Sequence, residues 1–415
     1  MWPKKLAIAI LAIHANPLAA LGSRDTGGMS VCIRELAAEL GARGHRVDIY
    51  TARPAGAAGP EMGLAPGVRL VTVGEGDASV PKAELAGQAA SLARAVARQA
   101  AAEGMVYDLV HSHYWLSGLV GALLAREWRL PHLVSFHTLA AVKNRLACGE
   151  DEPPARLAAE AFLARHCQRL LASTCTERQE LIDSCGASPE RIALVPWGVD
   201  RRRFCLGDQG EARRQLGLPG AGRLLLFVGR PAPIKGLERL LAACRELALP
   251  APSCLLVIGG DEPAASGPPL SPGLPVLRLG GKDHRQLPLY YQAADLVILP
   301  SCWESFGLAA LEALSCGTPV LATPVGAMPD LLHPGRNGLL LGDTSPAGLA
   351  QAIRRLLDRI GRGHFPRPQV RSSVAGSSWS QVADRLLAEY AGLLLPPAAL
   401  PPPGRMEAGQ GVAWR

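Results

Sequence analysis

An apolar run, a glycine turn, an amphipathic segment and a second apolar run open this sequence and restrict its fold most strongly. The apolar runs are residues 6–13 (LAIAILAI) and 46–52 (RVDIYTA). Between them, apolar residues recur with the spacing of one helix face, at Ile33, Leu36, Ala37 and Leu40. Gly41 and Gly44 close this helix pattern. Strand, helix and strand in this order predict a right-handed crossover unit, whose parallel strands need cover on both sheet faces.

The first apolar run has a second interpretation, as a secretory signal peptide. Lys4 and Lys5 precede its eight apolar residues, and the small residues Ala-Ala-Leu-Gly-Ser follow at 19–23. An apolar core of eight residues is near the lower limit for such a peptide, and removing it would delete the first strand of the crossover unit. We therefore expect the run to be a structural strand.

Length and composition favour two domains with aliphatic cores. A chain of 415 residues is long enough for two domains of roughly 150 to 200 residues each. Hydrophobic residues make up 48% of the chain but aromatic residues only 5%. Leu, Ala and Val must therefore supply most of the packing, as in buried parallel strands covered by Ala-rich helices.

Charge and cysteine content argue against several classes of function. The net charge of +7 is spread along the chain without basic clusters among aromatic residues, so we expect no nucleic-acid partner. No apolar run is long enough to span a bilayer, although the positive charge leaves a peripheral membrane contact open. The ten cysteines form no CxxC pair, which indicates neither a metal site nor a disulfide framework and predicts reduced thiols in a cytoplasmic protein.

Apolar runs alternate with helix-like segments along most of the chain. In the first half, further strands are predicted at 107–113, 130–138 and 169–176. In the second half, strands are predicted at 223–230, 253–260, 275–281, 295–301, 318–324 and 337–342. This alternation predicts an α/β protein with two doubly wound, Rossmann-like domains.

Composition shifts give the expected boundaries of these domains. We expect an N-terminal domain at 1–206, a C-terminal domain at 207–378, a single amphipathic helix at 379–395 and a disordered tail at 396–415. The tail begins within LPPAALPPPG, which is too rich in proline for regular structure.

Loops that follow strands are the candidate sites, because a doubly wound sheet binds ligands outside the carboxyl ends of its strands. Gly27 and Gly28 lie between the first predicted strand and its helix, where backbone N–H groups can bind phosphate oxygens. A plain turn explains these two glycines equally well. The GxGxxG pattern of dinucleotide-binding folds does not follow the strand, which disfavours a cofactor-dependent dehydrogenase.

Two later loops carry charged residues suited to a phosphorylated ligand. GRPAPIKGL follows a strand and holds Arg230 and Lys235, whose guanidinium and ammonium can bind a diphosphate. WESFGLAALEAL follows the strand at 295–301, with Glu304 before a predicted helix and Glu312 inside it. The amides at the amino end of that helix favour a negative phosphate. The glutamates suit hydrogen bonds from sugar and ribose hydroxyls as well as acid/base chemistry.

A set of segments distributed over both halves is characteristic: DTGGMSVCIREL, HSHYWLSG, FHTLAAVKN, VPWGVDRRRF, FVGRPAPIKG and PSCWESFGLAALEALSCGTPVLAT. Together they resemble the family-4 retaining glycosyltransferases of the GT-B fold, from about Leu6 to Tyr390. The EX7E stretch with its GTPV continuation is the most specific part. HANPLAALGSRDTGGMS and HSHYWLSG resemble the branch that contains D-inositol-3-phosphate glycosyltransferase and sucrose-phosphate synthase. The resemblance implies two Rossmann-like domains that face across a cleft, with the helix from Trp379 returning to the first.

The resemblance also implies how the donor would be bound. Arg230 and Lys235 would hold the donor diphosphate, together with the Gly27-Gly28 loop of the opposite domain and the amides that follow Glu304. These amides belong to Ser305, Phe306, Gly307 and Leu308. Departures from the family pattern at 259–270, 325–332 and 361–373 leave this clamp intact. They leave open the form of the base-binding wall near residues 281–284, and with it the identity of the nucleotide.

The same resemblance places groups around the donor sugar. Glu304 would accept hydrogen bonds from hydroxyls of the sugar, and Glu312 from hydroxyls of the ribose. His137 would lie beside the anomeric carbon; taken alone, it is as readily a core histidine at a strand end. The implied catalytic residues are therefore His137, Arg230, Lys235 and Glu304.

A phosphate-bearing acceptor is implied by the inositol-phosphate branch. There a lysine, a tyrosine, a threonine and an arginine gather the acceptor phosphate, and Lys82, Tyr114, Thr138 and Arg156 occupy similar places here. Tyr114 and Thr138 lie inside matched motifs. Lys82 and Arg156 lie in poorly matched loops, where ordinary surface residues are the alternative.

The expected activity is transfer of a hexosyl group from a nucleoside diphosphate sugar to an acceptor hydroxyl, with retention of the anomeric configuration. No carboxylate pair has to act as nucleophile and acid, and the resemblance implies a same-face displacement in which the departing diphosphate takes the acceptor's proton. We expect neither a metal nor a cofactor, the nucleotide sugar being a co-substrate. Transfer to a lipid or polysaccharide, a nucleotide-sugar epimerase of the same fold and a non-catalytic sensor remain alternatives.

Overall fold

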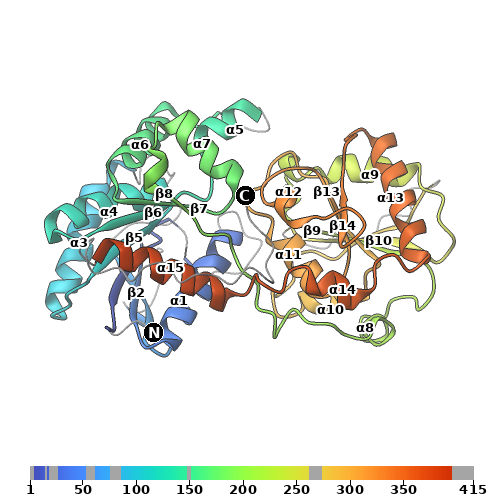
Figure 1. Ribbon diagram of the computed structural model, residues 1–415, viewed down its shortest axis with the longest axis horizontal. Coiled ribbons are helices and arrows are strands. Elements are labelled where there is room, and N and C mark those ends of the chain that lie inside the picture. Colours follow the sequence, from blue (N-terminus) through green and yellow to red (C-terminus); the bar gives the residue numbers. More distant parts are fainter. Residues whose placement is uncertain are drawn as a thin grey trace, which may run out of the picture.

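The computed structural model describes residues 4–14, 16–17, 27–52, 61–74, 86–146, 151–260 and 273–394 and folds them into two α/β lobes. Figure 1 shows the lobes side by side along the long axis of the molecule, the first half of the chain in the blue-green lobe and most of the second half in the yellow-orange lobe. The predicted α/β class with two Rossmann-like sheets is confirmed. The predicted tail at 396–415 lies outside the described residues.

The first lobe is built on an eight-stranded sheet with the order β3-β4-β2-β1-β5-β6-β7-β8. Its strands are β1 Ala7–Leu11, β2 Arg46–Ala52, β3 Glu61–Ala65, β4 Val68–Val73, β5 Leu109–His113, β6 His132–Ser135, β7 Arg169–Ala172 and β8 Ile192–Leu194. Neighbouring strands run parallel, except that β3 pairs antiparallel with β4 at one edge. The opening apolar run forms β1, in the interior of the sheet between β2 and β5, where Ile8 and Leu11 are fully buried.

Helices cover both faces of this sheet, as parallel strands require. They are α1 Gly28–Ala42, α3 Ala89–Ala102, α4 Trp115–Trp128, α5 Ala140–Leu146, α6 Pro154–His166 and α7 Cys175–Cys185, with a 3₁₀ turn at Pro189–Arg191. The buried face of α1 contains the four apolar residues whose spacing predicted it, Ile33, Leu36, Ala37 and Leu40.

The second lobe is built on a six-stranded parallel sheet with the order β11-β10-β9-β12-β13-β14. Its strands are β9 Leu224–Val228, β10 Cys254–Ile258, β11 Val276–Arg278, β12 Leu296–Leu299, β13 Val320–Ala322 and β14 Gly338–Leu340. Its helices are α8 Gln209–Gln215, α9 Leu237–Arg245, α10 Leu287–Ala293, α11 Leu308–Ser315, α12 Met328–Leu331, α13 Pro346–Gly361 and α14 Arg367–Ser372, with a 3₁₀ turn at Pro233–Lys235. Each strand predicted in the second half of the sequence contains one of these strands.

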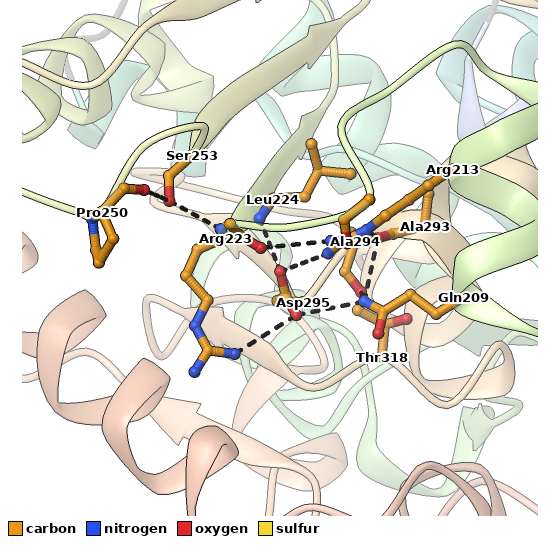
Figure 2. A network of polar contacts seen from close by, with 12 residues as sticks. Gln209, Arg213, Arg223, Leu224, Pro250, Ser253, Ala293, Ala294, Asp295 and Thr318 are labelled. Atoms are coloured by element: carbon orange, nitrogen blue, oxygen red, sulfur yellow. Dashed lines mark hydrogen bonds and ion pairs between the residues drawn. The ribbon is translucent and has the colours of Figure 1, made fainter.

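A buried carboxylate fastens α8 to the second sheet (Figure 2). Asp295 Oδ2 accepts hydrogen bonds from Nη2 of Arg213 at 2.8 Å and from the backbone N–H of Leu224 at 2.7 Å. Its Oδ1 accepts a third from Nε2 of Gln209 at 3.3 Å. Because Arg213 and Gln209 lie on α8 and Leu224 opens β9, this first helix after the lobe crossing belongs to the second lobe.

The chain crosses between the lobes twice, and the two crossings are bonded to each other. Arg371 donates from Nη1 to the carbonyl oxygen of Phe204 at 2.8 Å and from Nη2 to that of Arg201 at 3.0 Å. After the second crossing, α15 (Trp379–Leu394) packs against α1 of the first lobe, as Figure 1 shows for the red helix. There the hydroxyl of Tyr390 lies 2.8 Å from Nδ1 of His111.

Two further properties concern only the described part of the chain. None of its helices combines the length and apolar character needed to cross a bilayer. Within the same residues, no group of three or more His, Cys, Asp or Glu side chains is arranged to hold a metal ion.

Candidate active site

A cleft of about 730 Å³ lies between the lobes, at the loops that follow β1, β5, β6, β9 and β12. This is where doubly wound sheets bind ligands. The predicted site residues in its wall are Gly27, Gly28, Tyr114, His137, Thr138, Arg230, Lys235, Glu304, Ser305, Phe306, Gly307, Leu308 and Glu312. The structure does not bring Arg156 to this wall, and Lys82 lies outside the described residues.

The loops after β9 and β12 meet because these strands are neighbours in the second sheet. Nζ of Lys235 lies 2.7 Å from Oε2 of Glu304, and the hydroxyl of Ser301 donates to Oε1 of Glu304 at 2.7 Å. Gly236 permits this approach: its φ is 69°, and a Cβ there would lie 2.0 Å from the carbonyl oxygen of Pro300. A cation and a carboxylate thus stand side by side in the wall of the cleft.

The amino end of α11 presents backbone amides to the same place. Phe306, Gly307 and Leu308 line the cleft where this helix begins. Gly307, the residue before the first turn, has φ 103°, which an L side chain rarely adopts. The helix dipole adds positive potential near Lys235, so the site favours a phosphate group.

The first lobe approaches this amino end closely. Trp197, in the loop after β8, stacks on Phe306 with ring centroids 5.4 Å apart. A Cβ on Gly28 would lie 3.2 Å from Cζ3 of Trp197 and 3.6 Å from Cδ1 of Leu308. The Gly27-Gly28 loop therefore faces the proposed phosphate position from the opposite lobe, as the sequence resemblance implies.

Glu312 lies one turn further along α11, with its side chain only 7% exposed. Its Oε1 is 2.7 Å from Nε2 of His284, and its Oε2 accepts a hydrogen bond from the hydroxyl of Tyr291 at 2.8 Å. Glu304 and Glu312 are therefore bonded to different partners, and the structure gives no sign that they act as an acid/base couple.

His137 stands in a strained turn at the end of β6. Its φ is 63°, in the left-handed region that non-glycine residues rarely occupy outside functional sites. Its Nε2 lies 2.8 Å from Nδ1 of His113, at the end of the neighbouring strand β5. Beneath the turn, the buried carboxylate of Glu177 accepts hydrogen bonds from the backbone N–H groups of His137 and Ser173. These contacts hold the imidazole against the cleft.

Burial keeps this histidine neutral. It lowers the pKa of His137 to about 3, from an ordinary value of 6.5. Burial, and then the neighbouring rings, lower the pKa of His113 well below its ordinary value. A neutral His137 can form hydrogen bonds in the cleft, whereas burial disfavours its imidazolium form there.

The surroundings of Arg156 differ from the sequence-based expectation. The buried guanidinium of Arg156 donates to Oε1 of Glu160 at 2.7 Å and to Oγ1 of Thr138 at 2.8 Å, and it lies 4.8 Å from the ring centroid of Tyr114. Its Nη1 pairs with Oε1 of Glu152 at 2.8 Å. Contact between Arg156 and an acceptor phosphate would require Glu152 to move aside.

Some groups in the cleft wall were not predicted from the sequence. Lys143 lies on α5 with Nζ 2.5 Å from Oε1 of Glu152, and both residues line the cleft. Trp197 also lines the cleft, as do Lys282 and His284, which belong to the segment 281–284 where the resemblance placed the base. Lys143 and Trp197 belong to segments already identified as characteristic, FHTLAAVKN and VPWGVDRRRF, so motif membership was the signal for them.

Two family models cover most of the chain. The model described as "Glycosyl transferase 4-like domain" matches residues 27–198, and the model described as "Glycosyl transferases group 1" matches residues 208–360. The first match falls in the first lobe and the second in the second lobe.

Curated relatives match nearly the whole length. The chain is 41% identical to "D-inositol 3-phosphate glycosyltransferase 2" of Catenulispora acidiphila over 370 residues, covering 85% of this chain and 86% of that one. It is 40% identical to "D-inositol 3-phosphate glycosyltransferase" of Mycobacterium bovis over 403 residues, covering 92% and 82%. In both cases the similarity extends across the two lobes and the cleft between them.

Solved structures share the architecture. Sucrose-phosphate synthase from Thermosynechococcus elongatus superposes with a TM-score of 0.84 at 29% identity, covering 94% of this chain and 99% of that one. Anabaena HepE, solved with UDP and glucose, has a TM-score of 0.72 at 20% identity, covering 94% and 100%, and shows the fold alone. The predicted family and enzyme class are confirmed: this chain belongs to the family-4 glycosyltransferases of the GT-B fold, in the branch of D-inositol 3-phosphate glycosyltransferase and sucrose-phosphate synthase, and is a hexosyltransferase.

Proposed function

We propose that this protein transfers a hexosyl group from a nucleoside diphosphate sugar to an acceptor hydroxyl, with retention of the anomeric configuration. One observation carries the proposal: Arg230, Lys235 and the amino end of α11 line a single cleft, opposite the Gly27-Gly28 loop of the other lobe. Two cations and a helix amino end on one side of an interlobe cleft suit a diphosphate leaving group.

The donor sugar would lie between Glu304 and His137. Glu304 accepts hydrogen bonds from Lys235 and Ser301 and retains lone pairs for sugar hydroxyls. When a diphosphate enters, Lys235 can share its charge between Glu304 and the phosphate, because an ammonium offers three donors.

The proposed reaction is a displacement on one face of the sugar. The acceptor oxygen forms a bond to the anomeric carbon on the face from which the diphosphate departs. The bond between the anomeric carbon and the diphosphate oxygen breaks, and its electron pair goes to the diphosphate. The departing diphosphate takes the proton of the acceptor hydroxyl, so no protein acid is needed. Lys235, Arg230 and the α11 amides stabilise the charge that develops on the leaving group.

We further propose an acceptor that carries a phosphate, such as an inositol phosphate. The names of the curated relatives support this, since they describe transfer to D-inositol 3-phosphate. The cleft supports it with Lys143, Tyr114 and Thr138 in its wall and Arg156 directly behind them. Lys143 and Arg156, which both pair with Glu152, can bind the phosphate of the acceptor once the Glu152 carboxylate moves away from them.

The test is release of nucleotide from UDP-, GDP- and ADP-linked hexoses in the presence of D-inositol 3-phosphate, fructose 6-phosphate, or each parent polyol or sugar. We expect release to require both a donor and a phosphorylated acceptor, and the product's anomeric proton coupling by NMR to match that of the donor. Equal rates with the unphosphorylated compounds would overturn the acceptor proposal. An inverted linkage would overturn retention, and isomerised donor without an acceptor would indicate an epimerase.

A further inference from the structure

His284 lies between the donor cleft and the first crossing of the lobes. Its Nε2 is 2.7 Å from Oε1 of Glu312, and its Nδ1 is 3.3 Å from Nη1 of Arg203. Its ring packs against Phe204, with ring centroids 5.1 Å apart. The side chain is only 10% exposed. Contacts on three sides therefore fix the orientation of this imidazole.

The hydrogen bonds with Arg203 and Glu312 also determine which ring nitrogen of His284 carries the proton. A guanidinium can only donate, so Nδ1 of His284 accepts from Arg203. An imidazole that accepts at Nδ1 is neutral and carries its proton at Nε2, which therefore donates to Glu312. Because the hydroxyl of Tyr291 donates to the other oxygen of Glu312 at 2.8 Å, two neutral donors hold this carboxylate. Each of its oxygens retains lone pairs for hydroxyl groups in the cleft.

Arg203 connects this arrangement to the first lobe. Its Nη1 lies 3.5 Å from Oε1 of Glu35 on α1, and its Nη2 lies 3.5 Å from Oδ2 of Asp200. The side chain is 32% exposed, so each of these ion pairs contributes little stability by itself. Together, the ion pairs with Glu35 and Asp200 fix the direction of the Arg203 guanidinium, and this guanidinium in turn fixes the orientation of the His284 ring. A continuous chain of polar contacts thus runs from α1 through Arg203 and His284 to Glu312.

We propose that His284 is a positioning residue for the ribose of the donor nucleotide, and that Arg203 orients it from the lobe crossing. This inference rests on the proposed function, in which a nucleoside diphosphate sugar occupies the cleft and Glu312 accepts hydrogen bonds from ribose hydroxyls. His284 holds the Glu312 side chain in the rotamer in which its carboxylate can accept hydrogen bonds from the ribose hydroxyls. The ribose-binding carboxylate is thereby set by contacts with both lobes.

Two matched substitutions separate the hydrogen bonds of the ring. The amide of H284Q reaches about as far as Nε2 and can still donate to Glu312, whereas the shorter amide of H284N can bond only toward Arg203. Isothermal titration calorimetry of the full chain would use UDP, ADP and GDP, each beside its 2′,3′-dideoxy counterpart. We expect H284N to weaken the preferred ribonucleotide about tenfold or more while leaving its dideoxy counterpart unchanged. H284Q should restore the ribonucleotide to within about threefold of the wild type.

The control is H166N, the same substitution at an exposed histidine on α6 that does not line the cleft. Equal weakening of the ribonucleotide and the dideoxynucleotide in H284N would indicate general damage to the fold and would overturn the inference. Equal affinities of H284N and H284Q for the ribonucleotide would overturn it as well. If the wild-type protein binds none of the three nucleoside diphosphates, the proposed function is wrong. The inference about His284, which rests on that function, is then wrong as well.

Discussion

Lys235 and Glu304 form a direct ion pair in the cleft, with Nζ of the lysine 2.7 Å from Oε2 of the glutamate. The two residues are far apart in sequence but follow β9 and β12, which are neighbours in the second sheet. The pair places a mobile positive charge beside the group expected to bind the donor sugar. Because the proposed function has Lys235 share its charge between Glu304 and the diphosphate, Lys235 is the first residue to test.

Replacing Lys235 with methionine should lower turnover more than donor affinity. Methionine keeps most of the side-chain volume but removes the charge that stabilises the leaving diphosphate, a loss of roughly 2 to 4 kcal/mol of transition-state stabilisation. We expect kcat at saturating donor to fall by about 30-fold to 1,000-fold, measured by nucleotide release. Arg285→Met, which breaks only an exposed pair with Asp283, is the control. Nearly full turnover in the Lys235 variant would refute the clamp.

Most of the architecture was predictable because the signals are local. The alternation of apolar runs with helix patterns indicates parallel strands, and neighbouring strands bring their loops together whatever lies between them in sequence. The sequence could therefore place Arg230, Lys235 and Glu304 in loops that follow strands, and the family resemblance then gathered them around one donor. The hairpin of β3 and β4 gave a weaker signal, since Pro66 and Gly67 divide it into two short strands, of which β3 lies at the sheet edge.

Side-chain pairing was harder to predict, with one exception. The contact of His284 with Arg203 joins residues 81 positions apart and depends on the direction of both side chains, which no local pattern encodes. The burial of Arg156 did have a local signal. Glu160 lies four residues after it on α6, and that spacing on a helix brings the guanidinium and the carboxylate together. Glu152, which forms the second pair, precedes the helix.

Substituting Gly307 with alanine should impair donor binding through the backbone. The residue has φ 103°, and a Cβ would lie 2.1 Å from Cε of Met328. Met328 can move its flexible end, so strain of the backbone dominates and costs about 1 to 2 kcal/mol. The amides at the start of α11 should shift and the Kd for nucleotide should rise, as titration calorimetry can measure. Gly392→Ala in α15, where nothing lies within 4 Å of the added methyl, should be neutral or stabilising. Equal Kd values for both variants would exclude a special role for Gly307.

Replacing Arg156 with methionine should mainly lower the stability of the fold, whereas replacing Lys143 with methionine should mainly weaken binding of the acceptor. Arg156 pairs with Glu160 inside the lobe, and removing one partner of a buried pair costs about 3 to 5 kcal/mol of unfolding free energy. Lys143 is partly exposed, so its loss should leave stability nearly unchanged but weaken binding of a phosphorylated acceptor by about tenfold. Urea unfolding and acceptor KM report the two effects. Lys4→Met, at a surface pair with Asp108, is the control, and an unchanged acceptor KM in the Lys143 variant would contradict the proposed acceptor end.

Acid should destabilise the first lobe at a pH where most carboxylates are still ionised. Burial lowers the pKa of His111, His132 and His137 to about 3 each, from an ordinary value of 6.5. Below pH 6.5 these histidines are therefore protonated in the unfolded chain but stay neutral in the folded chain. The free energy of unfolding consequently falls as the pH drops from 6.5 toward 3. Each fully shifted histidine contributes a slope of about 1.4 kcal/mol per pH unit. The raised pKa of buried Glu177 acts in the opposite sense and offsets one histidine at most.

His132 provides the variant that isolates this effect, because it does not line the cleft and its Nε2 bonds only to the hydroxyl of Ser112, at 2.8 Å, among the contacts described for its ring. In His132→Gln, an amide that does not titrate can take over this hydrogen bond. Urea unfolding at pH 7.5, 6, 5 and 4.5 should then show a shallower loss of stability than in the wild type, by about 1.4 kcal/mol per pH unit. At pH 7.5 the unfolding free energies of the two proteins should differ only by the effect of the substitution on packing. This effect is the same at every pH, so it cancels when each protein is compared with itself at pH 7.5. Identical slopes would mean that the buried imidazole already takes up its proton in the folded state.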